Sequence, residues 1–350
     1  MFQSNYTISS TILKNIAAIE AAKALIDNAP LVPSWENQFR EDAQIRTVHH
    51  GTHLEGNDLS LNQAKKIMEG EKIIGKSRDI QEVLNYHQVL AYIDKLQQKE
   101  KEESVYTKTV LKKIHSLTTY KLLPENECGK YREKKVVVKD SQSKQVVFIP
   151  PLPIEVPYQI EEFFNWLNSI DRKATHPVLR AGIAHYEIVR IHPFVDGNGR
   201  VARAFATLIL FKESYDIKKF FSLEEYYDSN ALSYYKALQS VQLDSSMTHW
   251  LEYFTLGLAV ELEKVKEKVE GLSLDTGLKN KLGKQIALSP RQIKMVRYLK
   301  EHSRILMGDA KKILPMVSDD TLLRDFRDLM NKGIIVREGR TKGVVYRLVG

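Results

Sequence analysis

Apolar residues recur at intervals of three and four positions along most of the chain. In residues 10–28 these positions are Ile12, Leu13, Ile16, Ile19, Ala22 and Leu25. Such spacing gathers the apolar side chains on one face and predicts an amphipathic helix. Comparable patterns predict helices over residues 36–52, 61–69, 78–98, 106–119, 154–169, 177–191, 201–211, 229–242 and 250–269. The chain is therefore expected to be mainly α-helical.

Two valine-rich runs break the helical pattern. They cover residues 135–139 and 145–149, with the polar segment 140–143 between them. β-Branched runs on both sides of a short polar segment predict a β-hairpin. Pro150 and Pro151 end the second run.

The C-terminal part of the chain shows another succession. Ser289 and Pro290 begin a predicted helix, with proline in its first turn. Two more helices are predicted over residues 309–314 and 318–332. Two β-rich runs follow, over residues 334–336 and 344–348, and a basic tip at residues 339–343 lies between them. Three helices and a basic hairpin resemble the winged helix-turn-helix, whose third helix enters the major groove of DNA.

The charges on that third helix leave its partner open. Four aspartates dilute the basic face, namely Asp319, Asp320, Asp325 and Asp328. Winged helices also serve as protein-interaction modules. DNA and protein therefore both stay open as partners of this part of the chain.

Composition and charge narrow the class of protein. The chain has 350 residues, of which 43% are hydrophobic, which suits two or three domains with buried cores. Its net charge is +8, and residues 289–350 hold 14 Lys+Arg against 7 Asp+Glu, a difference of +7. The single cysteine, Cys128, excludes an internal disulfide and fits a reducing compartment. The N-terminus has no signal-peptide layout, and no apolar run approaches membrane-spanning length, so we expect a cytoplasmic protein without membrane contact.

Candidate chemistry is concentrated in one stretch, residues 192–203. A predicted helix ends before it, and another begins near Asn198 or Gly199. Arg200 and Arg203 fall in the first turns of this second helix, where its dipole favours acidic residues instead. A bound polyanion resolves that conflict, because helix N-termini and arginine forks both bind phosphate.

Two further residues of the stretch suit phosphate chemistry. Asp196 can hold a hard cation such as Mg²⁺, which shares its coordination shell with substrate phosphates. His192 precedes Pro193, which favours an extended backbone at the histidine. At the mouth of an anion site, the imidazole can take a proton from an incoming hydroxyl.

The stretch His192-x-Phe-x-Asp-Gly-Asn-Gly-Arg-x-x-Arg203 resembles the signature of the Fic family at every fixed position. The resemblance implies the Fic helical fold and transfer of AMP from ATP to a Ser, Thr or Tyr hydroxyl of a protein. It makes His192 the general base and Asp196 the Mg²⁺ ligand. The remaining positions would bind the nucleotide: Gly197, Asn198 and Gly199 the α- and β-phosphates, Arg200 the phosphates, Arg203 the γ-phosphate, with Val201 and Ala202 beside them.

Glu55 and Gly56 follow the helix predicted over residues 36–52. Taken alone, Glu55 reads as a solvated glutamate. Many Fic proteins, however, carry an inhibitory helix ending in [ST]-x-x-x-E-[GN], whose glutamate pairs with the second signature arginine. By this resemblance Glu55 enters the nucleotide site and restrains the enzyme. The hydroxyl position of the motif is Gly51, with Thr52 next to it, which departs from the family pattern.

The resemblance also assigns two substrate-binding segments. The hairpin would be the flap that clamps a target protein by strand addition, through Gln145, Val146, Val147 and Phe148. Tyr235 and Gln242 lie seven apart, so they share a helix face and would stack on and hydrogen-bond the adenine. Aromatic residues at helical spacing are also typical of a core.

Two other patterns have an ordinary structural explanation. Residues 70–77 fit the phosphate-binding pattern G-x-x-x-x-G-K-[ST], including Lys76, but a predicted helix precedes them where that motif needs a strand. We therefore interpret them as an interhelix loop. His185 lies seven residues before His192, and without a third metal ligand nearby we expect it to pack in the core.

The patterns and the resemblance together predict four regions. An N-terminal helical region with the inhibitory helix covers residues 1–105, and a Fic catalytic core covers residues 106–262. A linker over residues 263–288 and a winged helix over residues 289–350 follow. The predicted function is ATP- and Mg²⁺-dependent protein adenylylation, with auto-modification included. Two alternatives stay open: removal of AMP, with Glu55 positioning a water, and a DNA-binding regulator whose Fic part senses nucleotide. The target, nucleotide preference and oligomeric state cannot be read from the sequence.

Overall fold

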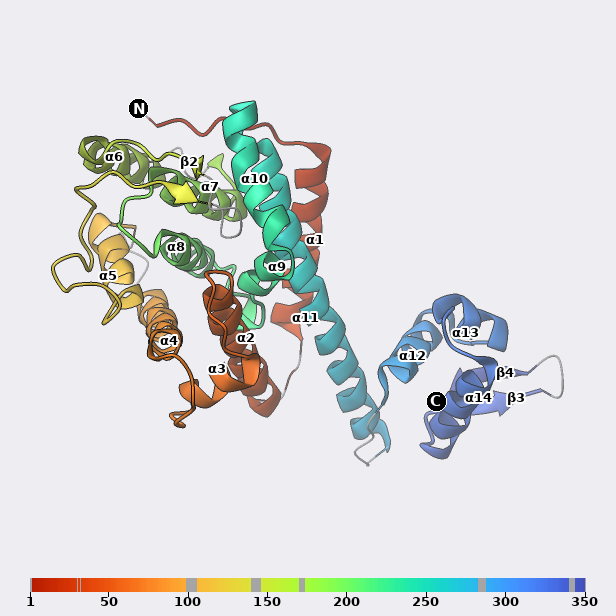
Figure 1. The fold of residues 1–350 in the computed structure, drawn as a ribbon. Helices are drawn as coiled ribbons and strands as arrows, with labels where there is room; N and C mark the ends of the chain where they lie inside the picture. The colour runs from red at the N-terminus through yellow and green to blue at the C-terminus, as the bar shows by residue number, and fades with distance from the viewer. Residues whose placement is uncertain are drawn as a thin grey trace. The chain divides into compact units, whose positions relative to one another are not determined.

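A computed structural model describes residues 2–29, 31, 33–98, 106–139, 146–169, 174–282, 288–339 and 344–349. The chain forms two compact units (Figure 1), the first of Met1–Asn28 with Val32–Val265, and the second of Ala29–Leu31 with Lys266–Gly350. None of the helices in these ranges is long and apolar enough to cross a membrane. Each unit has its own buried core and is described by itself.

The first unit consists almost entirely of helices. They are α1 (Ser10–Asn28), α2 (Pro33–His53), α3 (Leu61–Met68), α4 (Ser77–Gln98), α5 (Lys108–Thr118), α6 (Val156–Leu167), α7 (Pro177–Ile191), α8 (Asn198–Lys212), α9 (Leu223–Ser229), α10 (Ala231–Asp244) and the start of α11 (Thr248–Leu282). The helices expected from apolar spacing are confirmed, with ends shifted by a few residues. The short helix α9 was not expected.

Helices α7 and α8 form the centre of this unit (Figure 1). Both are apolar on nearly all sides, with Ile183 and Ile188 of α7 and Ala204, Phe205 and Leu208 of α8 fully buried. A helix that is apolar all round belongs in the interior of a fold. The loop between these two helices, residues 192–197, is therefore held by the most deeply buried part of the unit.

The buried face of α1 differs from the expected one. Leu13 is 59% exposed, whereas Asn15 is buried. Asn15 Nδ2 donates hydrogen bonds to Thr255 Oγ1 at 3.0 Å and to the carbonyl of Glu252 at 3.3 Å, both on α11. The buried position 15 is therefore occupied by a polar side chain whose hydrogen bonds are satisfied. Apolar spacing alone cannot predict such a buried polar residue.

The predicted hairpin is confirmed but shorter. Strands β1 (Val138–Lys139) and β2 (Val146–Phe148) pair antiparallel. Residues 135–137 lie outside the strand, and Gln145 lies outside the described residues. A 3-10 turn, η1 (Pro153–Glu155), then leads into α6.

Helix α11 extends into the region expected to be a linker with at most a short helix. It continues from Thr248 to Leu282. Leu262, Val265 and Val269 are buried, so the apolar stripe of α11 extends beyond the expected boundary at residue 262. Apolar spacing predicted this helix as far as residue 269, and its continuation to Leu282 lies beyond the predicted end.

The second unit confirms the predicted succession of three helices and a hairpin. Its elements are α12 (Pro290–His302), α13 (Met307–Ile313), α14 (Asp319–Asn331), β3 (Ile335–Glu338) and β4 (Val345–Leu348). Ser289 caps α12 with Gln292 in a capping box. Phe326 of α14 stacks on Tyr346 of β4, with ring centroids 3.9 Å apart. The assignment of this unit as a winged helix stays a prediction.

Candidate active site

His192 has a left-handed backbone, with φ 50° and ψ 58°, so the expected extended conformation is wrong. The residue is the C-cap of α7, and its N–H donates to the carbonyl of Ile188 at 3.0 Å. Pro193 disfavours the right-handed helical conformation at the residue before it. A left-handed cap is the common way to end a helix, and here it turns the chain into the loop.

The ring of His192 is held by its own helix. Nδ1 lies 3.2 Å from the carbonyl of Val189, which assigns the proton of the neutral ring to Nδ1 and leaves Nε2 unprotonated. Burial is the largest influence and lowers the pKa of His192; the hydrogen bond to Val189 opposes it, the charge of Arg132 adds to it, and Glu55 and Asp196 have smaller raising effects. A lowered pKa keeps the ring neutral near pH 7, which is the form that a general base needs.

Asn198 fixes the shape of the loop. Its side chain accepts from the N–H of Phe194 and donates to the carbonyl of Phe194, both at 2.9 Å, and it is buried. Gly197, at φ 77°, is the N-cap of α8. Because the Asn198 amide is used within the loop, its predicted phosphate contact rests on its backbone N–H.

Two residues that the sequence reasoning missed support this loop. His115 of α5 is fully buried and stacks on Phe194 at 3.8 Å. Its Nε2 lies 3.1 Å from the carbonyl of Asp196, and its Nδ1 accepts from the N–H of Gly129 at 2.8 Å. Burial lowers the pKa of His115 to about 4, so it stays neutral. His115 sits on the apolar face of its helix, and the sequence carries no signal that separates it from the core.

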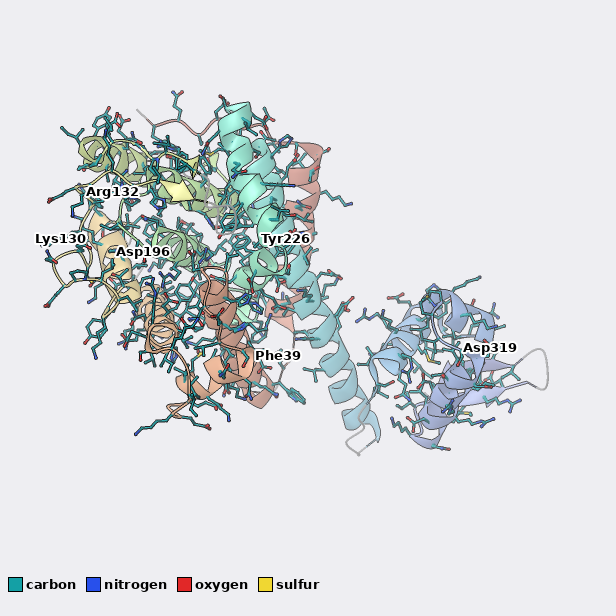
Figure 2. All side chains as sticks on the ribbon, viewed as in Figure 1. Phe39, Lys130, Arg132, Asp196, Tyr226 and Asp319 are labelled. Atoms are coloured by element: carbon teal, nitrogen blue, oxygen red, sulfur yellow. The ribbon has the colours of Figure 1, made fainter. Side chains whose placement is uncertain are left out.

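Arg132 is the second such residue (Figure 2). It is 3% exposed, and its Nε donates to the carbonyl of His192 at 2.7 Å. Its Nη2 donates to the carbonyl of Pro151 at 2.6 Å, and its backbone N–H donates to the carbonyl of Pro193 at 2.9 Å. One guanidinium thus joins the end of α7, where a cation is favoured by the helix dipole, to the segment that follows β2.

Asp196 lies at the accessible edge of the loop, with its side chain 46% exposed. Oδ1 accepts from the N–H of Gly197 at 2.6 Å, and Oδ2 lies 3.4 Å from Arg78 Nη2. No group of three or more His, Cys, Asp or Glu in the described ranges could hold a metal ion. The assignment of Asp196 as a Mg²⁺ ligand stays a prediction, in which water and a phosphate-bearing substrate would supply the other ligands.

Arg200 is buried beside Glu82 of α4, with Nη1 3.4 Å from Glu82 Oε1. Asn57 Nδ2 donates to the other oxygen of Glu82 at 3.1 Å. In the described part of the chain, Nε of Arg200 has no hydrogen-bond partner, and Nη1 has only the ion-pair contact with Glu82. Buried guanidinium N–H groups without acceptors suit a phosphate oxygen.

Arg203 is paired with Glu55, as the resemblance implied. Arg203 Nη2 lies 2.7 Å from Glu55 Oε1 and donates to the carbonyl of Gly51 at 2.9 Å. Burial alone would lower the pKa of Arg203, but the charge of Glu55 and the hydroxyls of Tyr234 and Tyr86 outweigh it, and the pKa is raised. The arginine is charged at every accessible pH.

The carboxylate of Glu55 lies directly in front of the first turn of α8. A Cβ built on Gly199 would collide with Glu55 Oε1 and lie 3.2 Å from Arg203 Nη1. Glycine at position 199 thus allows an anion to approach the helix N-terminus closely. Glu55 occupies the position that the dipole and the two arginines prepare for an anion.

The departure from the inhibitory motif at Gly51 has a steric cause. A Cβ at this position would lie 2.6 Å from Tyr86 Cε1 and 3.3 Å from Glu224 Cγ. The neighbouring Thr52 is no substitute, because its hydroxyl donates to the carbonyls of Val48 and His49 within α2, each at 3.0 Å. The ring of Tyr86 therefore takes the space that a hydroxyl-bearing side chain would need.

A contact with α9 holds the last turn of α2. His50 Nδ1 lies 2.7 Å from Asp228 Oδ2, and His53 Nδ1 lies 2.8 Å from Asp228 Oδ1. One carboxylate thereby binds two turn-related histidines next to Glu55. Helix α9 was absent from the predicted elements, so this contact could not be anticipated.

The structure brings Tyr235 towards the site, but it does not place Gln242 there. Tyr235 Oη donates to the carbonyl of Leu54 at 3.4 Å, and the residue is 41% exposed. Gln242 is exposed on the same helix, α10. Val201 and Ala202 are fully buried, which leaves only their backbone for a nucleotide. The assignment of all four to nucleotide binding stays a prediction.

Both ordinary structural interpretations are supported. His185 is fully buried, with Nε2 2.8 Å from Tyr234 Oη, so it packs in the core as expected. The helix α3 precedes residues 70–77 where a phosphate-binding loop needs a strand, and Lys76 is paired with Asp58.

The flap residues are described only in part. Val146 is 50% exposed, Phe148 is half-buried, and nothing is described of Gln145 or of the Val147 side chain. Their contact with a target protein stays a prediction.

Comparison with known proteins agrees with this geometry. Residues 105–210 match the Fic/DOC family. Over 192 residues the chain is 32% identical to the protein adenylyltransferase Fic of Nematostella vectensis, a match that covers 54% of this chain and 43% of that one. The Drosophila melanogaster protein of the same name is 33% identical over 179 residues, covering 50% and 34%. The chain thus spans less than half of the length of these relatives.

Solved structures show the same fold. A Fic family protein from Desulfovibrio desulfuricans superposes with a TM-score of 0.66 at 24% identity, covering 100% of this chain and 99% of that one. Fic-1 of C. elegans gives a TM-score of 0.58 at 24% identity, covering 75% and 74%. The part of the chain that matches the Fic/DOC family contains the signature stretch, which forms the loop between α7 and α8 and the first turns of α8.

Proposed function

We propose that this protein is an adenylyltransferase that transfers AMP from ATP to a protein hydroxyl and is restrained by Glu55. One observation carries the proposal: a carboxylate occupies the anion position between Gly199 and Arg203. An anion site built from a helix N-terminus and buried arginines suits a polyphosphate. The name of the relatives, protein adenylyltransferase Fic, supports the choice of nucleotide and reaction.

His192 would act as the general base. Nε2 would take the proton of the target hydroxyl while that oxygen attacks the α-phosphorus and pyrophosphate leaves. Arg200 and Arg203 would bind the departing phosphates through Nε, which in both residues has no hydrogen-bond partner among the described residues. Asp196 would hold Mg²⁺, which, when bound, neutralises phosphate charge.

Glu55 would restrain this reaction by competition. A γ-phosphate beside Arg203 would need the space that the carboxylate occupies. ATP bound with its phosphates displaced would miss the in-line geometry that transfer requires. The hairpin β1–β2 would present the target segment by strand addition at the exposed edge near Val146.

The decisive experiment compares wild type with Glu55→Gly, using ATP labelled at the α-phosphate. We expect at least about a tenfold gain in label on the target or on the protein itself, equivalent to about 1.4 kcal/mol of barrier. Label at the γ-phosphate should not transfer. Glu69→Gly, which removes an exposed helix-end glutamate away from the site, should behave as wild type. No gain for Glu55→Gly at saturating Mg·ATP would reject the restraint.

The same variants separate transfer of AMP from its removal. An AMP-removing enzyme that uses Glu55 to position water would release AMP from a modified protein as wild type and lose this activity as Glu55→Gly. An adenylyltransferase would show the opposite dependence on Glu55. His192→Ala should abolish both while retaining ATP binding.

We also propose DNA as a partner of the second unit, because two of the four aspartates of α14 are bound by side chains of α12. Arg291 Nε donates to Asp325 Oδ2 at 2.8 Å, and Gln292 Nε2 donates to Asp328 Oδ2 at 2.7 Å, both from α12. Arg324 and Arg327 remain on the exposed side. The acids therefore dilute the basic face less than the sequence suggested.

A shift assay over a range of salt tests this second candidate. Replacing Arg324 and Arg327 by alanine should weaken binding and reduce its salt dependence. Lys300→Ala, an exposed cation of α12, is the matched control. An equal loss in both variants, or no binding by wild type, would contradict a DNA site on α14.

A further inference from the structure

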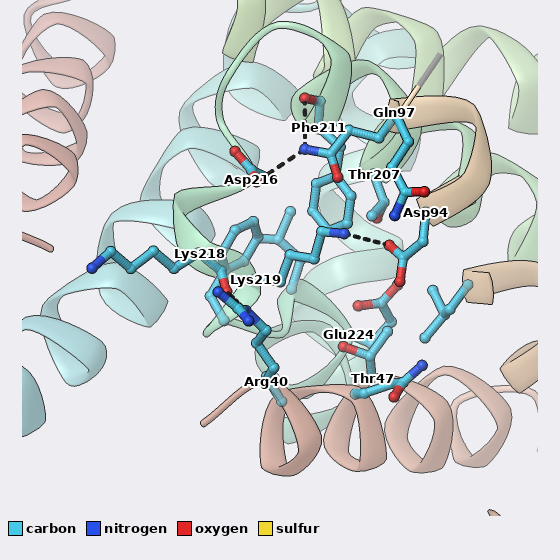
Figure 3. Close-up of a pocket in the computed structure, with 16 residues that line it drawn as sticks. Arg40, Thr47, Asp94, Gln97, Thr207, Phe211, Asp216, Lys218, Lys219 and Glu224 are labelled. Carbon is cyan, nitrogen blue, oxygen red and sulfur yellow. Dashed lines mark hydrogen bonds and ion pairs between the residues drawn. The ribbon is translucent and has the colours of Figure 1, made fainter. Parts of the chain in front are cut away.

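A cavity of about 620 Å³ lies in the first unit, between α2, α4 and α8 (Figure 3). Its volume falls within the usual range of small-molecule sites. Buried residues from α2, α4 and α9 form part of its wall, among them Ala43, Thr47, Leu90 and Glu224. None of the residues assigned to nucleotide, metal or target binding lines it.

The cavity shares two helices with the Fic site. Thr207 lies one turn beyond Arg203 on α8, and Thr47 lies one turn before Gly51 on α2. A molecule in the cavity would therefore touch the helix that carries Glu55 and the helix that carries its partner Arg203.

One wall of the cavity is strained. Ile217, Lys218 and Lys219 all have left-handed backbones, with φ of 44°, 54° and 61°. Left-handed conformations are unfavourable for residues with a Cβ, and such outliers cluster at ligand sites. The segment is held by an ion pair between Lys219 Nζ and Asp94 Oδ1 at 2.8 Å.

The charges of the cavity largely cancel. Three cations and three anions line it, namely Arg40, Lys218 and Lys219 with Asp94, Asp216 and Glu224, and both Arg40 and Lys218 are ion-paired with Glu36 of α2. Lys219 is ion-paired with Asp94, and Gln97 Nε2 donates a hydrogen bond to Asp216 Oδ2 at 2.9 Å. No excess of either sign is left to recruit a highly charged ligand, in contrast to the start of α8.

Neutral polar groups remain available instead. Within the described ranges, the side chains of Gln44, Thr47 and Thr207 line the cavity without a hydrogen-bond partner. Phe211 and Phe221 add aromatic surface. Hydroxyl and amide groups beside aromatic rings suit an uncharged, ring-bearing molecule rich in hydroxyls.

We propose that this cavity binds an uncharged, hydroxyl-rich small molecule of nucleoside or disaccharide size, and that binding strengthens the Glu55–Arg203 contact. The second part of this proposal, that binding strengthens the Glu55–Arg203 contact and so restrains AMP transfer, rests on the proposed function. The cavity exists in the state in which Glu55 is paired, so a molecule that fits it favours that state by its differential affinity.

Contacts connect the cavity to the pair directly. Glu224, in the cavity wall, accepts a hydrogen bond from Tyr86 Oη at 3.0 Å. The Tyr86 ring packs against Gly51, whose carbonyl accepts from Arg203 Nη2 at 2.9 Å. Three contacts thus lead from the cavity wall to the arginine.

Calorimetry on the full chain tests binding, with adenosine and maltose as neutral probes and AMP as the anionic one. At least one neutral probe should bind at one site per chain. Gln44→Leu and Thr207→Val, which preserve bulk, should each weaken it about tenfold or more. Tyr235→Ala, which would remove adenine stacking in the Fic site, should leave this binding unchanged.

Three results would overturn the site: no binding of either neutral probe, AMP binding with the same dependence on Gln44, or loss of binding in Tyr235→Ala alone. The regulatory half is tested by AMP transfer. The bound probe should lower transfer by wild type severalfold and leave Glu55→Gly unaffected. Equal inhibition of both would reject the coupling. Binding without any transfer in either protein would reject the proposed function and leave the cavity site standing.

Discussion

At the scale of single residues, the part of the candidate site that the sequence could predict was the contiguous signature, residues 192–203. His192, Asp196, Arg200 and Arg203 stand within one loop and the first two turns of a helix, so their proximity follows from the chain itself. Arg132 is sixty positions from its hydrogen-bond partner His192. Its role depends on a contact between distant segments, which no local pattern encodes.

Arg132 gives the first prediction at this scale. Arg132→Met removes the bond to the His192 carbonyl and a positive charge that lowers the pKa of His192. The pKa should rise towards its ordinary value, so that less neutral base is present at pH 6. We expect transfer to fall about tenfold or more, and the acid limb of its pH–rate profile to move to higher pH.

The control for this change is Lys134→Met. Lys134 is exposed, and only its backbone carbonyl accepts from Arg132. Removing its side-chain charge should leave the profile where it is. An Arg132→Met protein with reduced rate and an unshifted acid limb would assign the arginine a purely structural role.

Lys76 gives a second prediction. Its pairing with Asp58 at an exposed loop, after a helix and not a strand, excludes a phosphate-binding loop. Lys76→Ala should leave ATP affinity unchanged by calorimetry. A tenfold loss would show that residues 70–77 contact the nucleotide after all.

At the scale of elements, periodicity located helices well and their ends poorly. The continuation of α11 through the expected linker and the presence of α9 both escaped it. Helix α11 ends at Leu282, beyond the predicted end at residue 269, and α9 has only seven residues and shows no full period. Short helices depend on tertiary packing, because nucleation is costly.

Gly51 in α2 supplies the prediction for this scale. Restoring the hydroxyl of the family motif, as Gly51→Ser, should press a Cβ against Tyr86. Overpacking costs about 1–3 kcal/mol, and strain at this point should loosen α2 from α8. We expect a lower thermal midpoint together with increased AMP transfer.

A matched change next to it is Thr52→Ser, which keeps the hydroxyl bonded within α2. It should leave transfer unchanged. A Gly51→Ser protein as stable and as restrained as wild type would show that Tyr86 moves without cost.

At the scale of the whole molecule, buried histidines set a pH dependence of folding. Burial, and then the charge of Arg203, lower the pKa of His185 well below its ordinary value of about 6.5. Below pH 6.5 the His185 ring binds a proton in the unfolded chain but stays neutral in the folded chain. Stability is therefore fully present above pH 6.5 and falls as the pH decreases, by up to about 1.4 kcal/mol per pH unit from this group.

His185→Gln should flatten that slope in urea unfolding of the full chain between pH 5 and 7.5. The loss of packing lowers stability at every pH, so the slope is the informative quantity. His249, which is exposed on α11, provides the control as His249→Gln. An unchanged slope for His185→Gln would assign the acid sensitivity to other groups.

The pair between Glu55 and Arg203 has one more consequence, which concerns concentration. Glu55 belongs to the same chain as its site, so it is present there at a constant effective concentration. An anion from solution must compete with it at its own, variable concentration. If the paired state outweighs the open state about a hundredfold, the apparent affinity for the incoming anion falls about a hundredfold. Productive occupancy of the site would then follow the cellular level of that anion, instead of saturating at its lowest values.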